Sequence, residues 1–188
     1  MDTVTTLDLA PAARRVAALL PGIRPEQLGD PVASCPGFDV ATLLDHLVTL
    51  TAAFTHSARK TPRGVPAPAS AAHLDPDWRT ELPDRLAELA AAWAEPQAWE
   101  GGSSAGGLDL PAAEVGLIAL NELVVHGWDL ARATHQRFSV DGPSAHACLR
   151  FAERFQEVPG LFGPRVEVGE GAPLFHRVLG LEGRDPRI

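Results

Sequence analysis

The sequence predicts an all-α bundle, and three features lead to this fold class. Of the 188 residues 45% are apolar, which is enough for one buried core. Alanine and leucine dominate and tyrosine is absent, a composition that favours helices. Apolar residues recur at steps of three and four in several segments, as they do on one face of a helix. The length fits one domain, which we expect to extend over residues 1–188.

The first two helices are separated by a loop rich in proline and glycine. One helix is expected over residues 7–20, and the loop follows over residues 21–37. Asp39 then has the position of an N-cap residue for a second helix over residues 40–60. His46 lies near or within the apolar side of this second helix.

The middle of the chain contains a connector, a helix and a glycine-rich stretch. Residues 61–78 are rich in proline, alanine and serine, and we expect them at the surface. The third helix is expected over residues 78–93, although Pro83 favours a start nearer residue 81. Residues 96–111 place glycines between two short extended pieces. A phosphate loop needs a lysine after the glycines and a strand before them, so we expect a hairpin or plain loop.

The C-terminal half begins with the longest predicted helix, over residues 111–136. A fifth helix is expected over residues 143–157. The tail then alternates briefly around Val166 and Val168, and a short apolar helix follows over residues 174–179. We therefore expect a four-helix bundle with an extra C-terminal helix and short extended or hairpin decoration.

Glu122 and His126 lie one turn apart on an apolar face of the long helix. Their side chains are about 40° apart around the helix axis. Burying either polar group alone is costly, and a bundle brings His46 to the same interior. Two neutral imidazoles and one carboxylate form a ligand set for a divalent transition metal with a position left open. A solvated pair or a satisfied core contact is the alternative for the same spacing.

Several neighbouring residues are candidates for supporting roles. Asp129 follows His126 by three residues, so it either orients that imidazole or lies exposed. Asp45 has less support for a similar role. Trp128 lines a pocket or packs against a neighbour. Cys35 is interpreted as a plain loop cysteine because no nearby base or ligand spacing supports a reactive thiol.

Charge and hydropathy exclude several classes of protein. The net charge is −8 and the 16 basic residues form no run, which disfavours nucleic-acid binding. No apolar run approaches the roughly 20 residues that span a bilayer, and the acidic N-terminus lacks the features of a signal peptide. Two cysteines make no disulfide framework. We expect a soluble cytoplasmic protein without a membrane partner, and the apolar bundle faces favour a homodimer.

Three stretches resemble a known family. The string NELVVHGWDLARATHQ (121–136) is similar to the signature of the mycothiol-dependent maleylpyruvate isomerase-like proteins of the DinB-like superfamily. SCPGFDVATLLDHLV (34–48) resembles the family segment that leads into its first metal histidine, although Phe38 stands where the family usually has Trp. GLEGRDP (180–186) resembles the end of a short actinobacterial metal-binding subgroup.

This resemblance implies a DinB-like four-helix bundle that holds a divalent metal. Position by position, the family's two histidines and glutamate fall on His46, Glu122 and His126. Zinc is the first expectation, with nickel, iron or manganese as alternatives. The isomerase proper has an additional C-terminal substrate domain, which we expect to be absent from this chain.

The implied function is that of a metal-dependent enzyme, with its chemistry at the metal. It would activate a low-molecular-weight thiol such as mycothiol for isomerase or S-transferase reactions on a small-molecule substrate. Two alternatives stay open. One is a thiol-independent zinc or non-haem iron enzyme, and the other is a non-catalytic bundle that binds a metal or an apolar ligand.

Overall fold

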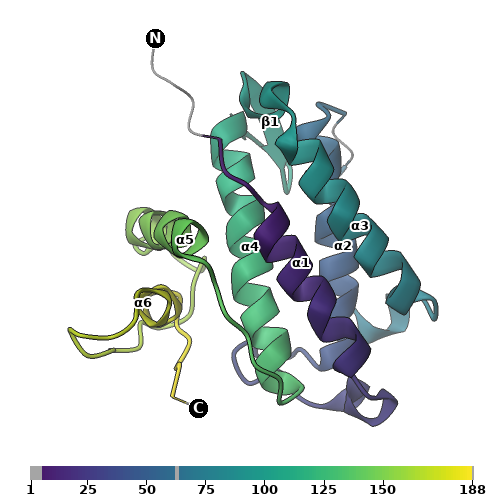
Figure 1. The fold of residues 1–188 in the computed structure, drawn as a ribbon, viewed down its shortest axis with the longest axis vertical. Helices are drawn as coiled ribbons and strands as arrows, with labels where there is room; N and C mark the ends of the chain where they lie inside the picture. Colours follow the sequence, from purple (N-terminus) through teal and green to yellow (C-terminus); the bar gives the residue numbers. More distant parts are fainter. Residues whose placement is uncertain (1–5, 62–63, 188) are drawn as a thin grey trace.

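Four helices form the bundle in the computed structural model, which describes residues 6–61 and 64–187. They are α1 (Ala10–Leu19), α2 (Val40–Ala58), α3 (Trp78–Ala94) and α4 (Ala112–Ala133). Helix α2 packs against α3 and α4, and α1 packs against the same two helices (Figure 1). The predicted mostly-α fold of the DinB-like type is therefore confirmed. The acidic residues 1–5 and residues 62–63 of the predicted connector lie outside the described part.

The start of α2 is fixed by its N-cap and by the loop before it. The Thr42 amide donates to Asp39 Oδ1 at 2.8 Å, as predicted for an N-cap residue. Two 3₁₀ turns, Leu20–Gly22 and Pro25–Gly29, begin the preceding loop. The Val32 amide then donates to the Phe38 carbonyl at 2.9 Å and closes this loop beside the helix. The closed loop brings Ser34 and Cys35 to Asp129 of α4.

Helix α3 begins at Trp78 and continues through Pro83, so the predicted start nearer residue 81 is wrong. Tertiary contacts outweigh the helix-breaking effect of the proline here. Trp78 and Leu82 are buried. The Arg79 guanidinium, at the same end of the helix, donates to the carbonyls of Leu20 at 3.1 Å and Ile23 at 2.7 Å. These contacts hold the first turns of α3 against the end of α1.

The glycine-rich stretch before α4 is a hairpin, as predicted. Strands β1 (Gly102–Ala105) and β2 (Leu108–Pro111) pair antiparallel. The turn between them consists of Gly106 and Gly107, whose φ angles are 57° and 83°. Only glycine adopts these positive values readily, so the glycines serve the turn.

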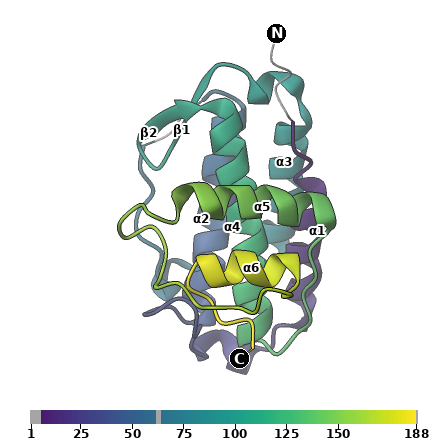
Figure 2. The same ribbon diagram turned by 90° about the vertical axis from the view of Figure 1, so that its left-hand side faces the viewer.

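Two further helices form a separate layer outside α4. Helix α5 (Gly142–Phe155) packs against α4, and α6 (Leu174–Leu181) packs against α5. Both run across the direction of α4 (Figure 2). The predicted alternation around Val166 forms no strand in the described residues. Instead, the Val166 amide donates to the Gly180 carbonyl at 2.9 Å, and the tail packs on α6.

No helix within residues 6–61 and 64–187 has the length and apolar character needed to cross a membrane. The predicted single domain over residues 1–188 stays a prediction.

Candidate metal centre

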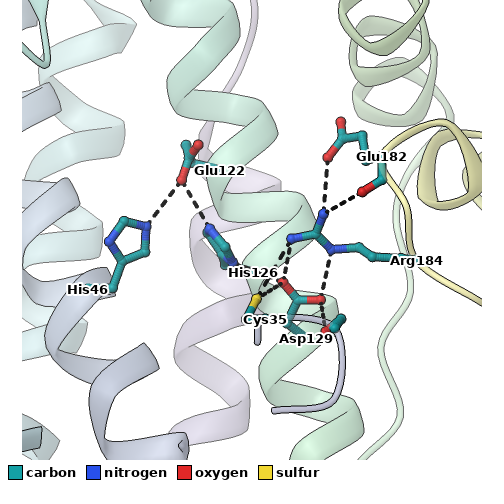
Figure 3. Close-up of polar contacts among 8 residues, drawn as sticks. Cys35, His46, Glu122, His126, Asp129, Glu182 and Arg184 are labelled. Carbon is teal, nitrogen blue, oxygen red and sulfur yellow. Dashed lines mark hydrogen bonds and ion pairs between the residues drawn. The ribbon is translucent and has the colours of Figure 1, made fainter. Parts of the chain in front are cut away.

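Helices α2 and α4 bring the three predicted ligands together (Figure 3). His46 Nε2 lies 3.3 Å from Glu122 Oε2, and His126 Nε2 lies 3.2 Å from the same oxygen. The two imidazole rings are nearly perpendicular, at 88°, with their centroids 4.9 Å apart. One ligand atom from each residue lies within 4.8 Å of the other two. Three donors from two helices therefore converge on one point.

The two separations from Glu122 Oε2 fit a tetrahedral ion. A charge-assisted N–H···O hydrogen bond is usually about 2.7–2.9 Å long, so separations of 3.2 and 3.3 Å are long for such bonds. Around zinc with bonds of about 2.0–2.2 Å, neighbouring ligand atoms of a tetrahedron lie about 3.4 Å apart. The chemistry of the donors, two imidazoles and a carboxylate, also suits a divalent transition metal.

The site is open on one side. The side chains of His46 and Glu122 are each 31% exposed, and that of His126 is 14% exposed. Among the described residues, no fourth histidine, cysteine, aspartate or glutamate joins this group. A metal held here would therefore keep a coordination position for water or a substrate, as catalytic sites do.

The electrostatics of Glu122 and His126 favour opposite charges when no metal is bound. Burial by itself would raise the pKa of Glu122. Hydrogen bonds from His126 and His46 outweigh burial and hold this pKa well below its usual range. Burial would lower the pKa of His126, but its contacts with Asp129, Cys35 and Glu122 hold it well above 6.5. Metal ligation thus has to displace a proton from His126.

Asp129 contacts the His126 ring at Nδ1, the nitrogen that does not face Glu122. His126 Nδ1 lies 2.9 Å from Asp129 Oδ2, so a proton on Nδ1 leaves Nε2 free to face the ligand group. The Asp129 side chain is fully buried, and Arg184 makes a bidentate pair with it at 2.9 and 2.8 Å. The Ser34 hydroxyl donates to Asp129 Oδ1 at 2.5 Å. Burial would raise the pKa of Asp129, and His126 and Arg184 together keep it well below its usual range.

Cys35 lies in this same cluster, which differs from its interpretation as a plain loop cysteine. Its thiol is 3.3 Å from Asp129 Oδ2 and 3.9 Å from Arg184 Nη2. Cys35, His126 and Asp129 form a second group of close potential ligands. The guanidinium already neutralises the carboxylate of that group, so a divalent cation fits the group of His46 and Glu122 better.

The other two predicted neighbours have separate surroundings. Asp45 is buried, and its Oδ2 accepts from the Ser70 amide at 3.0 Å, which anchors the connector between α2 and α3. Trp128 is 9% exposed and lines a cleft of about 540 Å³ beside the C-terminal end of α4. Asp129 and Arg184 also line this cleft, so the pair that holds His126 forms part of its wall.

Sequence reasoning did not identify Arg184 or Ser34. Both lie in stretches that carry the family resemblance, SCPGFDVATLLDHLV and GLEGRDP. Those motifs were the available signal. Asp129 and Arg184 are 55 positions apart, however, and helical spacing cannot reveal a contact at that separation.

The fold and the site define a helical-bundle protein with a candidate metal centre. The model of the mycothiol maleylpyruvate isomerase N-terminal domain matches residues 9–131. The chain belongs to this family, which confirms the predicted resemblance. Comparisons with curated proteins and with solved structures found no match. The matched region includes His46, Glu122, His126 and Asp129 but ends before α5.

Proposed function

We propose that this protein is a metal-dependent enzyme that activates a low-molecular-weight thiol. The observation that carries the proposal is the convergence of three donors at spacings of 3.2 and 3.3 Å with one side open. A divalent metal at such a position lowers the pKa of a coordinated thiol or water. The family is named after a mycothiol maleylpyruvate isomerase, and membership in it favours mycothiol or a similar thiol as the co-substrate.

The residues of the chain have separate roles in this proposal. His46, Glu122 and His126 hold the metal. Asp129 accepts the Nδ1 proton of His126 and so presents Nε2 as the donor atom. Arg184 keeps Asp129 ionised in its buried position. The protein itself supplies no nucleophile, because the reacting sulfur belongs to the thiol.

The cleft beside Trp128 is the proposed place for the small-molecule substrate. Its volume, about 540 Å³, lies within the usual range for small-molecule sites. Its lining combines apolar groups with charged ones, including Arg132 and Asp30. An electrophile bound there would lie next to Asp129 and Arg184, which support His126. Addition of the thiolate to the electrophile would give an adduct, which would release the thiol again in isomerisation or would itself be the product in S-transfer.

Other parts of the proposal follow from the sequence. Zinc is the proposed metal, with nickel, iron or manganese as alternatives, and the proposed location is the cytoplasm. A homodimer stays a prediction.

Cobalt substitution tests this function directly. The protein is loaded with Co²⁺ and titrated with mycothiol and with a simpler thiol while the visible spectrum is recorded. We expect a sulfur-to-cobalt charge-transfer band that saturates with thiol. The same titration of His46→Ala should give no such band, and exposed His73→Ala should behave like the wild type.

A cobalt-loaded wild type whose spectrum ignores both thiols would overturn the thiol-dependent function. Hydrolysis or oxidation by a thiol-independent metal enzyme, or metal binding without catalysis, would then account for the site.

A further inference from the structure

The C-terminal cap of α6 fixes the backbone of Arg184. Gly183 follows the helix in the left-handed conformation, with a φ of 80°. Its amide donates to the Gly180 carbonyl at 3.2 Å. The Arg184 amide donates back to the Leu179 carbonyl at 2.8 Å. These are the two hydrogen bonds of a Schellman motif, so Arg184 is itself the last residue of the helix cap.

Two other helices end in the same motif without a glycine. Lys60 after α2 and His135 after α4 both have φ angles of 57°. The residues that follow them also donate to carbonyls five positions earlier, at 3.0 and 2.7 Å. The left-handed conformation alone therefore does not require glycine at the end of a helix in this chain.

Gly183 differs from these two residues because another segment lies directly against it. A Cβ atom on Gly183 would lie 2.7 Å from the Cα atom and the carbonyl carbon of Gly163. A Cβ atom on Gly180 would lie 2.6 Å from the Val166 carbonyl oxygen. The Val166 amide also donates to the Gly180 carbonyl at 2.9 Å. Residues 163–166 thus pack backbone to backbone against the cap, and no side-chain rotation could make room for a larger residue.

The guanidinium of Arg184 is held as firmly as its backbone (Figure 3). Nε and Nη2 donate to the two oxygens of Asp129 at 2.9 and 2.8 Å, and Nη1 donates to the Glu182 carbonyl at 3.2 Å. Asp129 Oδ2, which accepts from Nη2, also lies 2.9 Å from His126 Nδ1. The direction of the guanidinium therefore sets the direction of the carboxylate that orients His126.

We propose that Gly183 is a positioning residue of the metal centre. It allows α6 to end against residues 163–166, and this packing presents Arg184 to Asp129, which in turn orients His126. The expected effect on zinc rests on the proposed function, whereas the effect on Arg184 does not. If Gly183 served only to end α6, its replacement would change the stability and leave the metal centre unaffected.

Gly183→Ala tests this role, and Gly160→Ala is the matched control. The two glycines have similar φ angles, 80° and 77°, so alanine strains the backbone equally at both positions. A Cβ atom on Gly160 would meet no atom of the described residues within 4 Å apart from its chain neighbours. Competition with a chelator gives the zinc affinity. We expect it to fall about 10-fold in Gly183→Ala, at the lower end of the effect of groups that orient metal ligands, and to stay unchanged in Gly160→Ala.

Proton–nitrogen NMR of the metal-free protein follows Arg184 directly. Its Nε–H, which donates to Asp129 from a side chain that is 11% exposed, should give a slowly exchanging signal. Arg184→Lys identifies this signal by its absence. We expect Gly183→Ala to lose the signal and Gly160→Ala to keep it. If Gly183→Ala does not fold, Gly183→Asn replaces it, because asparagine tolerates the left-handed conformation but carries the same Cβ atom.

A double-mutant cycle separates positioning from helix termination. Arg184→Lys keeps the charge but cannot form the two-pronged pair, so Gly183→Ala should cause little further loss of zinc affinity in that background. Losses that multiply would overturn the inference, as would a Gly183→Ala variant with the zinc affinity and the Nε–H signal of the wild type. A wild type that binds no zinc would refute the proposed function alone, because the signal from metal-free protein still tests how Arg184 is positioned.

Discussion

The bundle and the C-terminal segment contribute different groups to one site. Helices α2 and α4 provide the candidate ligands, which are partly exposed and spaced by helix geometry. The C-terminal segment provides Arg184, which is mostly buried and pairs through charge with Asp129 of α4. The family match covers the first region and ends at residue 131. The candidate ligands therefore lie within the region that matches the family, whereas the orientation of His126 depends on a segment outside it, because Arg184 holds Asp129.

The largest effect should follow the loss of Arg184. Arg184→Met leaves the Asp129 carboxylate buried without its cation, and breaking a buried pair in this way costs about 3–5 kcal/mol. Chemical denaturation of the metal-free protein measures this loss. Arg187→Met, which removes an exposed arginine of the same segment, should change the stability little. Equal stabilities of the two variants would show that the segment does not depend on the buried pair.

A smaller effect is expected from Asp129→Asn. The amide keeps the size of the side chain but supports His126 less well, so zinc affinity should fall by about 10–100-fold. Competition with a chromophoric chelator gives the affinity. Asp45→Asn is the matched control, because Asp45 is a buried carboxylate that bonds to the Ser70 amide instead. If Asp45→Asn lost as much zinc affinity as Asp129→Asn, Asp45 would support the metal centre as strongly as Asp129 does.

Metal binding should strengthen as the pH rises. The pKa of His126 is well above 6.5 in the folded, metal-free protein. The stabilisation that protonated His126 provides is therefore complete below its pKa in the unfolded chain, and it is lost as the pH rises through its pKa in the folded protein. Zinc binds only the neutral imidazole, so zinc affinity increases as His126 loses its proton. The increase in Tm on adding zinc should therefore grow between about pH 6 and pH 8. An increase that is constant over this range would argue against imidazole ligation.

The smallest effect concerns the outer layer. Arg154 of α5 contacts Glu114 of α4 at 2.7 Å, but the arginine side chain is 60% exposed. An exposed ion pair contributes about 0–1 kcal/mol. Arg154→Ala should thus lower the stability by no more than this and leave the zinc affinity unchanged. A larger loss would mean that α5 is held to the bundle by charge more than by its buried face.

Local patterns revealed the bundle and the ligand group. The spacing of Glu122 and His126 predicts their common face, and a helical bundle brings His46 to the same interior. The family motif then implies all three as ligands. The N-cap at Asp39 and the glycine hairpin also follow from local chemistry. Asp129 lies one turn from His126, and its contact with that imidazole is one of the two alternatives that the spacing left open.

The remaining features depend on contacts between distant parts of the chain. Pro83 indicated a later start for α3, but Arg79 binds carbonyls some 60 positions away and holds the earlier turns. The contact of Arg184 with Asp129 has no local signature. Tertiary packing brings buried charged pairs of this kind together, so the periodicity of the sequence could not identify them.

Metal content is the most direct test of the central claim. Elemental analysis would compare the purified wild type with His46→Ala, Glu122→Ala and His126→Ala, with His73→Ala as the control. We expect about one equivalent of zinc, nickel, iron or manganese in the wild type and control, and its loss in the other three variants. A folded wild type that holds no metal after reconstitution, or a His126→Ala variant that keeps its full metal, would show that His46, Glu122 and His126 do not form a metal site.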